Sequence, residues 1–434
     1  MYYFVGIKGT GMAALACILH DAGYHVEGSD LEKHFFTEDV LIDRNIPIYS
    51  FDENNIKDGM TVIIGNAFDK EFPEAKAAYG NPTCICYRYH EFLGEFLKNY
   101  HSICIAGSHG KTTTTGMTTA LLSVKEKIGY LIGDGTGHIE KDATDFVLEA
   151  DEFRRHFIAY HPDYAVITNM DWDHVDYFKT NEDYLSAFQQ FANQVSKALI
   201  IYGEDPYARE ITSKADIYYY GIEDNDDLQA VNILEDDKGM SFDVLLKGEM
   251  FGHFDLPFVG RHLLLNSLSV IMIGILKGMS PEEIEEGLSG FKGVKRRFVV
   301  EQNGENIYID DYAHHPTEVK VTLEAARMRY PDKKIVGIFK PHRASRVYYF
   351  ADKFVEALSL ADEVGVCEFT SIDDHADGCD INIDYLANMI DGCYVFHETD
   401  QDAQILKSFE PAVYVFMSSK DIYPFKEKLK KLQS

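Results

Sequence analysis

Hydrophobic residues recur along the chain with two alternating periods, that of a buried strand and that of an amphipathic helix. The first 30 residues form the pattern of a strand, a glycine turn, a helix and a second strand that closes at Asp30. This order predicts a βαβ unit at the start of a nucleotide-binding fold. Strand-like and helix-like stretches continue to alternate until a new apolar strand begins with "HSICIAG", residues 101–107.

Two further runs of this alternation follow. The strands "DFVLEA" and "YAVITN" end in polar residues, and "GVKRRF" precedes the strand "NIYIDDY", a helix from about Pro316 to Arg329 and the strand "KKIVGIF". The pattern predicts an α/β protein of three consecutive α/β domains. We place a Rossmann-like domain at 1–99, a P-loop-type ATPase domain at 100–298 and a Rossmann-like domain at 299–434. The acidic runs "EDNDD" and "EDD" (Glu235 to Asp237) are expected to be solvated loops.

Composition and charge limit the class of partner. The 434 residues are 46% hydrophobic and carry a formal charge of −30, which argues against a long positive face for nucleic acid or anionic lipid. The sequence contains neither a signal-peptide pattern at the N-terminus nor an apolar stretch long enough to span a bilayer. Seven scattered cysteines fit a reducing compartment. We expect a cytoplasmic protein, monomeric or homodimeric, that binds no nucleic acid and inserts into no membrane.

Residues 104–115, "CIAGSHGKTTTT", are similar to a phosphate-binding loop. Gly110, Lys111 and Thr112 match the end of the pattern G-x-x-x-x-G-K-[ST], but Ile105 replaces its first glycine. A strand that ends at Ala106 and a helix that begins near Lys111 direct the backbone N–H groups between them into one concavity. We expect Lys111 to bind phosphate and Thr112 to bind Mg²⁺, and the alternative is a purely structural turn.

Polar residues gather after two predicted strands of the same region. They are Glu149, Asp151 and Glu152 after one strand, and Asn169, Asp173, His174 and Asp176 after the other. A hard cation that bridges ATP phosphates needs oxygen ligands and accepts an imidazole. A helix cap is the simpler explanation for any one of these carboxylates, but the whole set favours a metal site.

Basic residues cluster before and inside the third predicted domain. "GVKRRF" places Lys295, Arg296 and Arg297 at a hinge, where an arginine can neutralise a transferring phosphoryl group. "IDDYAHHPTEV" and "FKPHRASR" both follow strands, and the arginine pair in the second stretch suits a carboxylate, which guanidinium binds as a bidentate fork. The alternative for either stretch is a solvated loop with no binding role.

The first glycine turn, "GIKGTG", has the order G-x-x-G-x-G, with Gly6, Gly9 and Gly11. It supports a diphosphate at a helix N-terminus without identifying the nucleotide. Asp30 suits a ribose, so an NAD-dependent oxidoreductase is an alternative at this point. That reading leaves Lys111, the carboxylates and the hinge arginines without a role.

The motifs "AGSHGKTTTT", "EADE", "TNMDWDHVDYF", "HLLLNSLSV", "GVKRRF", "DDYAHHP" and "FKPHRASR" together resemble the Mur ligase family, in its order and over essentially the whole chain. The resemblance implies an ATP- and Mg²⁺-dependent ligase of peptidoglycan precursor synthesis, in which Ile105 is a normal P-loop residue. In the reaction that the resemblance implies, the carboxylate of UDP-N-acetylmuramate attacks the γ-phosphate of ATP, and the amine of L-alanine then attacks the acyl phosphate. ADP and phosphate are released.

The resemblance also implies roles by position. For ATP it implies Gly107, Ser108, His109, Gly110, Lys111, Thr112, Thr113, Asn266, Arg297 and Asp311, with Asn266 at the adenine and Arg297, or alternatively Arg296, near the γ-phosphate. The implied Mg²⁺ ligands are Thr112, Glu149 and His174, and the UDP-sugar residues are Gly9, Thr10, Gly11 and Met12, to which we add Asp30. His342, Arg343 and Arg346 are expected to bind the amino acid, and the catalytic residues are expected to be Lys111, His174, Arg297, His314 and His342.

Three stretches differ from the family's pattern, one of which is "GNAF" at residues 65–68. "EADEFRRHF" replaces the expected "EADESD" and leaves Arg154, Arg155 and His156 without a role, and "FMSSKDI" replaces a glycine-rich turn at 418–421. A ligase that adds a preformed murein tripeptide, an archaeal pseudomurein ligase and a non-catalytic regulator are the alternatives on this scaffold. The paired arginines favour a small amino acid, and the complete phosphoryl-transfer set favours an enzyme. The choice among L-alanine, glycine and L-serine stays open.

Overall fold

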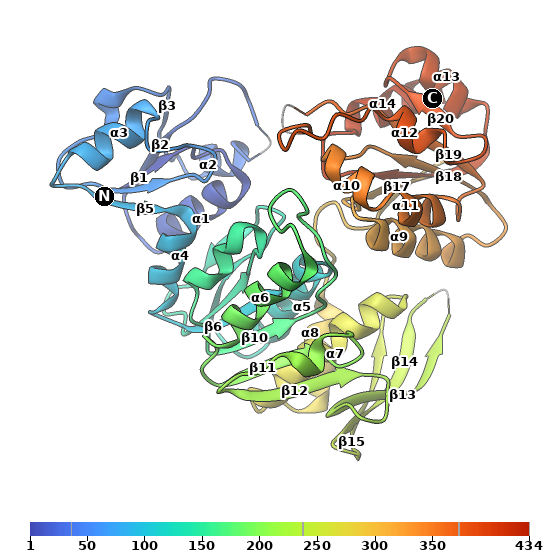
Figure 1. Ribbon diagram of the computed structural model, residues 1–434. Coiled ribbons are helices and arrows are strands. Elements are labelled where there is room, and N and C mark those ends of the chain that lie inside the picture. The colour runs from blue at the N-terminus through green and yellow to red at the C-terminus, as the bar shows by residue number, and fades with distance from the viewer. Residues whose placement is uncertain (36, 237, 372–373, 434) are drawn as a thin grey trace.

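The computed structural model contains three α/β units, each built on its own sheet (Figure 1). It describes residues 1–35, 37–236, 238–371 and 374–433. We call the three units the N-terminal unit (β1–β5 with α1–α4), the central unit (β6–β15 with α5–α8) and the C-terminal unit (β16–β21 with α9–α14). In Figure 1 the N-terminal and C-terminal units lie on either side above the central unit. The three sheets confirm the predicted α/β class, whereas the domain limits stay a prediction.

The N-terminal unit is a five-stranded parallel sheet in the order β3-β2-β1-β4-β5. Its elements are β1 (Tyr2–Val5), α1 (Thr10–Asp21), β2 (Val26–Ser29), α2 (Asp39–Asp43), β3 (Ile48–Tyr49), β4 (Thr61–Ile64), α3 (Pro73–Gly80), β5 (Ile85–Arg88) and α4 (Tyr89–Leu97). Strand β1 has β2 on one side and β4 on the other, so α1 begins at the point where strand order reverses. Open parallel sheets bind ligands at that point.

The central unit has ten strands in the order β15-β14-β13-β12-β11-β10-β6-β9-β7-β8. Its first half contains β6 (His101–Ala106), α5 (Lys111–Leu122), β7 (Ile128–Leu131), β8 (Gly137–Ile139), β9 (Asp145–Glu149), β10 (Tyr164–Ile167) and α6 (Asn181–Ala192). Its second half contains β11 (Ala198–Tyr202), β12 (Asp216–Gly221), β13 (Leu228–Glu235), β14 (Met240–Leu246), β15 (Glu249–Leu256), α7 (Arg261–Leu276) and α8 (Pro281–Gly290). Strand β6 lies between the parallel strands β9 and β10, which places the predicted P-loop at a second reversal of strand order.

The C-terminal unit has six strands in the order β16-β17-β21-β18-β19-β20, antiparallel only at β16. The elements are β16 (Val299–Asn303), β17 (Asn306–Asp311), α9 (Pro316–Arg329), β18 (Lys334–Phe339), α10 (Ala344–Tyr349), α11 (Ala351–Leu358), β19 (Glu363–Cys367), α12 (Asp384–Ala387), β20 (Tyr394–Phe396), α13 (Asp400–Lys407), β21 (Ala412–Met417) and α14 (Tyr423–Leu432). Helix α9 has the bounds that the sequence predicts, because Pro316 fixes its first turn.

Helix α5 forms despite a poor helical sequence, "KTTTTGMTTALL". Threonine loses side-chain freedom in a helix, so its intrinsic propensity is low. Thr115, Thr118 and Thr119 each donate a 2.8 Å hydrogen bond to the carbonyl four residues earlier. Gly116 lets Val294 and Phe291 approach the helix, since a Cβ there would lie 2.7 Å from Val294. Tertiary packing therefore stabilises the helix that carries the P-loop lysine.

The three units are joined in different ways. One apolar cluster includes residues of α1 and α4 together with the buried faces of β9 and α6, so the N-terminal and central units share a core. The C-terminal unit has its own clusters, and among the described residues only Trp172 and Val175 of the central unit belong to them. Polar contacts therefore have a larger part in holding the C-terminal unit in place.

Three simpler predictions concern the surface and the cysteines. None of the described helices combines the length and apolarity that a membrane crossing needs. Each of the seven cysteines is a free thiol. The loop prediction for the acidic runs is partly wrong, because Glu235 is the last residue of β13 and Asp226 is buried, with its pKa raised by burial to about 6. Asp237 lies outside the described residues.

Candidate functional site

The predicted P-loop joins β6 to α5 through two glycines of positive φ. Gly107 has φ +131° and Gly110 has φ +83°, a region that glycine adopts without strain. Space is a second constraint: a Cβ on Gly107 would overlap the Thr168 hydroxyl, and one on Gly110 would lie 2.9 Å from Asn266 Oδ1. The predicted strand end and helix start are confirmed. The asparagine predicted to read adenine thus lies beside the loop.

The amine of Lys111 lies against a buried carboxylate. Its Nζ is 2.8 Å from Oε2 and 3.0 Å from Oε1 of Glu152, and it also donates to two P-loop carbonyls. The Glu152 side chain is 1% exposed. Burial opposes the charge of Lys111, but neighbouring carboxylates, Glu152 first, outweigh burial and raise the pKa of Lys111. The lysine is therefore charged at neutral pH, and a phosphate that binds it has to compete with Glu152.

Two of the three residues predicted to bind Mg²⁺, Thr112 and Glu149, lie close together. Glu149 ends β9, and its carboxylate accepts a 2.9 Å hydrogen bond from the Gly133 N–H. Burial raises the pKa of Glu149, while Lys111 and the Thr112 hydroxyl act against the shift. Thr112 and Glu149 therefore belong together, beside the P-loop lysine.

His174, the third predicted ligand, lies with two other acids. Its Nε2 is 3.3 Å from Glu152 Oε1, and the ligand atoms of Asp151, Glu152 and His174 all lie within 4.8 Å of one another. The backbone of His174 has φ +52°, a conformation that is strained for a residue with a Cβ and is often found at functional sites. Oxygen and imidazole donors of this kind suit a hard divalent cation.

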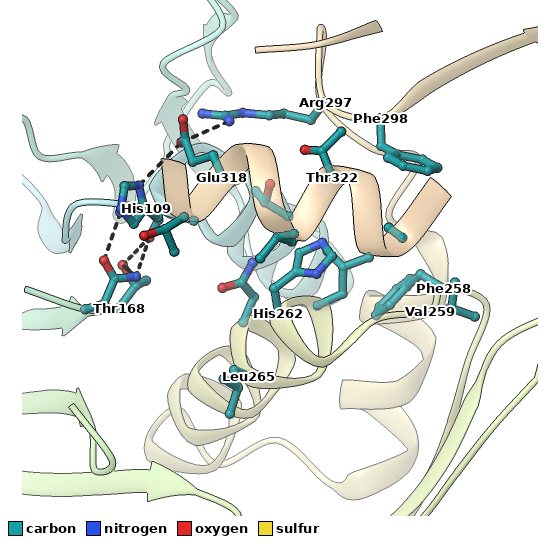
Figure 2. A pocket seen from close by; sticks show the side chains of 18 of the residues that line it. His109, Thr168, Phe258, Val259, His262, Leu265, Arg297, Phe298, Glu318 and Thr322 are labelled. Atoms are coloured by element: carbon teal, nitrogen blue, oxygen red, sulfur yellow. Dashed lines mark hydrogen bonds and ion pairs between the residues drawn. The ribbon is translucent and has the colours of Figure 1, made fainter. Parts of the chain in front are cut away.

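A cavity of about 730 Å³ lies between the central and C-terminal units (Figure 2). The P-loop, α7, the connection between α8 and β16, and α9 all contribute to its wall. Of the residues predicted for ATP, the wall contains His109, Gly110, Thr113, Asn266, Arg297 and Asp311. Gly107, Ser108, Lys111 and Thr112 are not among the described wall residues, and Lys111 is directed toward Glu152. A volume of this size suits a nucleotide.

Glu318, in the first turn of α9, contacts basic side chains that come from both the central and the C-terminal unit. Its Oε1 is 3.3 Å from Nη1 of Arg297 and 3.6 Å from Nδ1 of His109, which approach from opposite sides in Figure 2. Burial would raise the pKa of Glu318, but His314 and Arg297 lower it well below its usual range. His109 also lies 3.3 Å from Asp171. Although burial acts in the other direction, these two acids raise the pKa of His109 to about 9.

Asp311 and His314 follow β17 and lie beside this charge cluster. The Asp311 carboxylate accepts hydrogen bonds from the N–H groups of Phe298 and Ala313, at 2.8 and 2.7 Å, and burial raises its pKa to about 6. Nδ1 of His314 is 3.0 Å from the Tyr312 carbonyl, which makes Nε2 the acceptor nitrogen of the neutral ring. Burial lowers the pKa of His314, an effect that Glu318 opposes.

His342 and Arg343, predicted for the amino acid, precede α10. Nδ1 of His342 is 3.3 Å from Ser419 Oγ. Arg343 has φ +73°, and its Nη1 is 3.7 Å from Asp176 Oδ2. Arg343 therefore lies where the C-terminal unit faces the loop that carries His174, and His342 contacts the 418–421 turn of its own unit.

Arg346 has each of its guanidinium nitrogens engaged. Nε and Nη2 donate to the two oxygens of Asp173, at 2.9 and 3.2 Å, and Nη1 donates to the His342 carbonyl at 3.1 Å. Both side chains of the pair are 5% exposed. Asp173 thus occupies the fork that the sequence assigns to a substrate carboxylate.

The predicted UDP-sugar residues surround the start of α1. Gly9 is its N-cap and Thr10 its first residue, so the helix N-terminus points toward the end of β1. A Cβ on Gly11 would overlap the Tyr89 hydroxyl. Met12 packs its side chain in the core, 5% exposed, which leaves only its backbone available to a ligand.

Asp30 is buried and already engaged by the backbone around it. Oδ2 accepts a 2.7 Å hydrogen bond from the Lys8 N–H, and Oδ1 accepts one of 2.8 Å from the Leu31 N–H. These contacts hold the glycine turn after β1, so the structure gives Asp30 a local role. The reading of Asp30 as a dinucleotide ribose ligand loses its main support.

Glu318, Glu152 and Asp173 form the central contacts of the site, and the sequence predicts a site role for none of them individually. One feature of the sequence does concern Glu318. His315 and Glu318 have the spacing of a capping box, and the structure contains this capping box at the start of α9. That signal predicts a helix start and not a contact with another unit. The partners Arg297, His109 and Arg346 come from distant segments, which no local pattern identifies.

The residues 154–156 without a predicted role lie in a 3-10 segment, Phe153–Ala159. Arg154 and Arg155 have φ values of +51° and +61°. Arg155 Nη2 is 2.6 Å from Asp183 Oδ1. The His156 ring stacks on His90 of α4, with ring centroids 4.4 Å apart. This segment therefore lies where the central unit meets the N-terminal unit.

The atypical 418–421 turn has a structural partner in Arg296. Nη2 of Arg296 donates to the carbonyls of Ser418 and Lys420, at 2.8 and 2.9 Å. Its guanidinium also lies over the rings of Tyr312 and Tyr423. Arg296 therefore binds the C-terminal unit, while its neighbour Arg297 lines the cavity.

Models of known protein families match most of the chain. A model described as "Mur ligase family, catalytic domain" matches residues 1–101, one described as "Mur ligase middle domain" matches residues 105–274, and one described as "Mur ligase, glutamate ligase domain" matches residues 295–420. The three matched segments contain the three sheets except for most of β6.

Individual proteins agree with these matches. A UDP-N-acetylmuramate–L-alanine ligase of Lactiplantibacillus plantarum is 47% identical over 98% of this chain and 97% of its own length. The structure of the UDP-N-acetylmuramate–alanine ligase MurC of Thermotoga maritima has a TM-score of 0.82 and 27% identity, over 100% of this chain and 99% of that one. A murein peptide ligase of Psychrobacter arcticus has a TM-score of 0.75 and 23% identity, over 99% and 98% of the two chains, a likeness of fold.

Proposed function

Because the chain belongs to the Mur ligase family, we propose that it joins L-alanine to the carboxylate of UDP-N-acetylmuramate with conversion of ATP to ADP and phosphate. The observation that carries this proposal is the cavity between the central and C-terminal units. It brings P-loop residues, Asn266 and the hinge arginine Arg297 to one wall. The 47% identity to a UDP-N-acetylmuramate–L-alanine ligase over nearly the whole chain supports the choice of substrates. The reaction belongs to peptidoglycan precursor synthesis, and we place it in the cytoplasm, with the enzyme as a monomer or homodimer.

Each predicted domain has one task in this proposal. Residues 1–99 bind the UDP-sugar, with its diphosphate at the N-terminus of α1, where Gly9 and Thr10 lie. Residues 100–298 bind ATP in the cavity, and residues 299–434 present the amino acid. The segments that meet at the cavity come from the second and third of these domains. The carboxylate of the incoming alanine is assigned to Arg343 and His342, which precede α10.

The donors around Lys111 fit Mg²⁺ as the resident cation. Thr112, Glu149, Glu152 and His174 offer hard oxygens and one imidazole near the lysine. We propose that Thr112, Glu149 and His174 hold the ion, together with Glu152, which contacts His174. When bound, Mg²⁺ neutralises phosphate charge during phosphoryl transfer.

Activation of the carboxylate is the first chemical step. An oxygen of the muramyl carboxylate attacks the γ-phosphorus, the bond to the β–γ bridging oxygen breaks, and ADP leaves. Lys111 exchanges Glu152 for phosphate oxygens, and Arg297 balances the charge that develops on the transferred group. The product is an acyl phosphate, which has the good leaving group that a carboxylate lacks.

Amide formation is the second step. The amine of alanine attacks the acyl carbon, and the bond to the phosphate oxygen breaks. The amine must lose a proton, and His314 is suited to accept it, because burial lowers the pKa of its imidazole. With Nδ1 held at the Tyr312 carbonyl, Nε2 is the nitrogen that takes the proton.

Isotope transfer tests the proposed activation directly. UDP-N-acetylmuramate labelled with ¹⁸O in both carboxylate oxygens is expected to give released phosphate that carries one ¹⁸O atom, with the other retained in the amide. Mass spectrometry of the phosphate measures this. Unlabelled phosphate would contradict the acyl phosphate, and label in AMP would show that adenylylation replaces phosphorylation.

A further inference from the structure

A buried ion pair connects the C-terminal unit to the loop that carries His174. Arg346 of α10 contacts both carboxylate oxygens of Asp173, at 2.9 and 3.2 Å, and each side chain is 5% exposed. Removing two charges from water is unfavourable unless the pair is well aligned, and losing one partner leaves the other charge buried. The two units therefore have a strong reason to keep this contact once it has formed.

Asp173 acts on His174 as well as on Arg346. Its Oδ1 accepts a 2.6 Å hydrogen bond from the His174 N–H, so one carboxylate binds the guanidinium and the backbone of the next residue. His174 has φ +52°, which a histidine adopts only where its surroundings hold it. Its Nε2 then lies 3.3 Å from Glu152 Oε1. The contact between the units thus continues through His174 to the carboxylate that binds Lys111.

The same loop contacts the C-terminal unit at other points. Thr317 of α9 donates a 2.9 Å hydrogen bond to Asp171, and Val175 packs, 3% exposed, in the apolar cluster of the C-terminal unit. Within this loop the Asp173–Arg346 pair is the bidentate and buried contact. It is therefore the contact best able to fix the backbone at His174.

We propose that Asp173 and Arg346 are positioning residues: their ion pair, formed as the C-terminal unit closes on the central unit, holds His174 in its left-handed conformation and so aligns His174 and Glu152 with Lys111. This rests on the proposed ligase function and revises one part of it. Arg346 keeps Asp173 as its partner through the reaction, and the acceptor carboxylate binds to other groups. If Arg346 turned to a substrate carboxylate, Asp173 would lose its counter-charge and His174 its support.

The chain contains a single tryptophan, which reports on this contact. Trp172 precedes Asp173, and its ring lies 6.0 Å from that of Tyr349 and 6.1 Å from that of Phe350, both in the C-terminal unit. Its Nε1 donates a 3.2 Å hydrogen bond to the Phe178 carbonyl in its own unit. Separation of the units exposes this ring to water, so its fluorescence emission moves to longer wavelength.

The test compares Asp173→Asn, Arg346→Met, the double variant and Arg346→Lys by steady-state kinetics and tryptophan emission. Each single removal is expected to lower kcat by about 10²-fold, as small misplacements of catalytic groups do, with KM for L-alanine within about 3-fold of wild type. The double variant is expected to be no worse than either single variant, because both remove one contact. Tryptophan emission is expected to move to longer wavelength in the two single removals and in the double variant. Arg346→Lys keeps the positive charge and is expected to recover part of kcat.

Arg327→Gln is the matched control. Arg327 also pairs with an aspartate, Asp362, at 2.8 Å, but within the C-terminal unit and on its surface. It is expected to keep wild-type kcat and emission. Thermal unfolding of each variant identifies those that fail to fold, and Arg346→Lys then carries the test as the milder change.

Three results would overturn the proposal. One is a rise of more than about 10-fold in the L-alanine KM of Arg346→Met with kcat unchanged and Asp173→Asn unaffected, which assigns Arg346 to the acceptor. Losses that add in the double variant are the second, and unchanged tryptophan emission is the third. A wild-type protein without ligase activity would contradict the proposed function instead, while the emission measurements would still decide whether the pair holds the units together.

Discussion

Replacement of Lys111 by alanine is expected to lower kcat by about 10³-fold or more, which corresponds to about 4 kcal/mol of transition-state stabilisation. The lysine is charged, lies at the start of α5, and has Glu152 and P-loop carbonyls as its partners. Its removal takes away the point charge that meets the transferred phosphoryl group. The affinity for UDP-N-acetylmuramate is expected to change by less than about 2-fold, because that substrate is assigned to α1 on another sheet.

Calorimetry with the UDP-sugar and a turnover assay with all substrates measure these two quantities on the same sample. Lys125→Ala is a suitable control, since Lys125 follows α5 and pairs with Glu283 at the surface, with 49% of its side chain exposed. It is expected to retain wild-type kcat. Equal loss of turnover and of UDP-sugar binding in Lys111→Ala would contradict the assignment of the two sites to separate units.

Replacement of Arg297 by alanine is expected to lower the rate of phosphoryl transfer by about 10³-fold, the lower end of the range for arginines that neutralise a transferring phosphoryl group. Arg297 lines the cavity and is 3.3 Å from Glu318. Without Arg297, the Glu318 carboxylate still has His314 and His109 as partners. The fold is therefore expected to tolerate the change better than the reaction does.

Arg296→Ala is the matched comparison, because it removes an identical side chain from the adjacent residue. Arg296 donates to carbonyls of the 418–420 turn, away from the cavity wall. It is expected to lower the melting temperature while phosphoryl transfer in a single turnover stays within about 3-fold of wild type. The reverse pattern, with loss of transfer in Arg296→Ala and not in Arg297→Ala, would exchange the two assignments.

Local chemistry explains why some of the site could be predicted from sequence. Glycines at the P-loop and Pro316 at the start of α9 restrict the backbone by themselves, so the limits of β6, α5 and α9 agree with the prediction. The three-sheet α/β architecture follows from the alternation of the two hydrophobic periods in the same way.

The contacts between units could not be predicted, because a charged residue has the same local pattern whatever its partner. The sequence shows Asp173 only as a polar residue after a strand, and Arg346 only as one of two neighbouring arginines. These two residues are 173 positions apart in the chain, so their pairing depends on how the central and C-terminal units are placed relative to each other. The contacts of Glu152 with Lys111 and His174 and the local use of Asp30 are tertiary facts of the same kind.

Release of phosphate from Mg-ATP in the presence of UDP-N-acetylmuramate is the most direct test of the proposed ligase. The acceptors to compare are L-alanine, glycine, L-serine, a murein tripeptide and none. Phosphate release is expected to require both the sugar nucleotide and L-alanine, and to equal the amount of amide product. Release with the tripeptide and not with L-alanine, or no release from a folded protein that binds ATP, would contradict it.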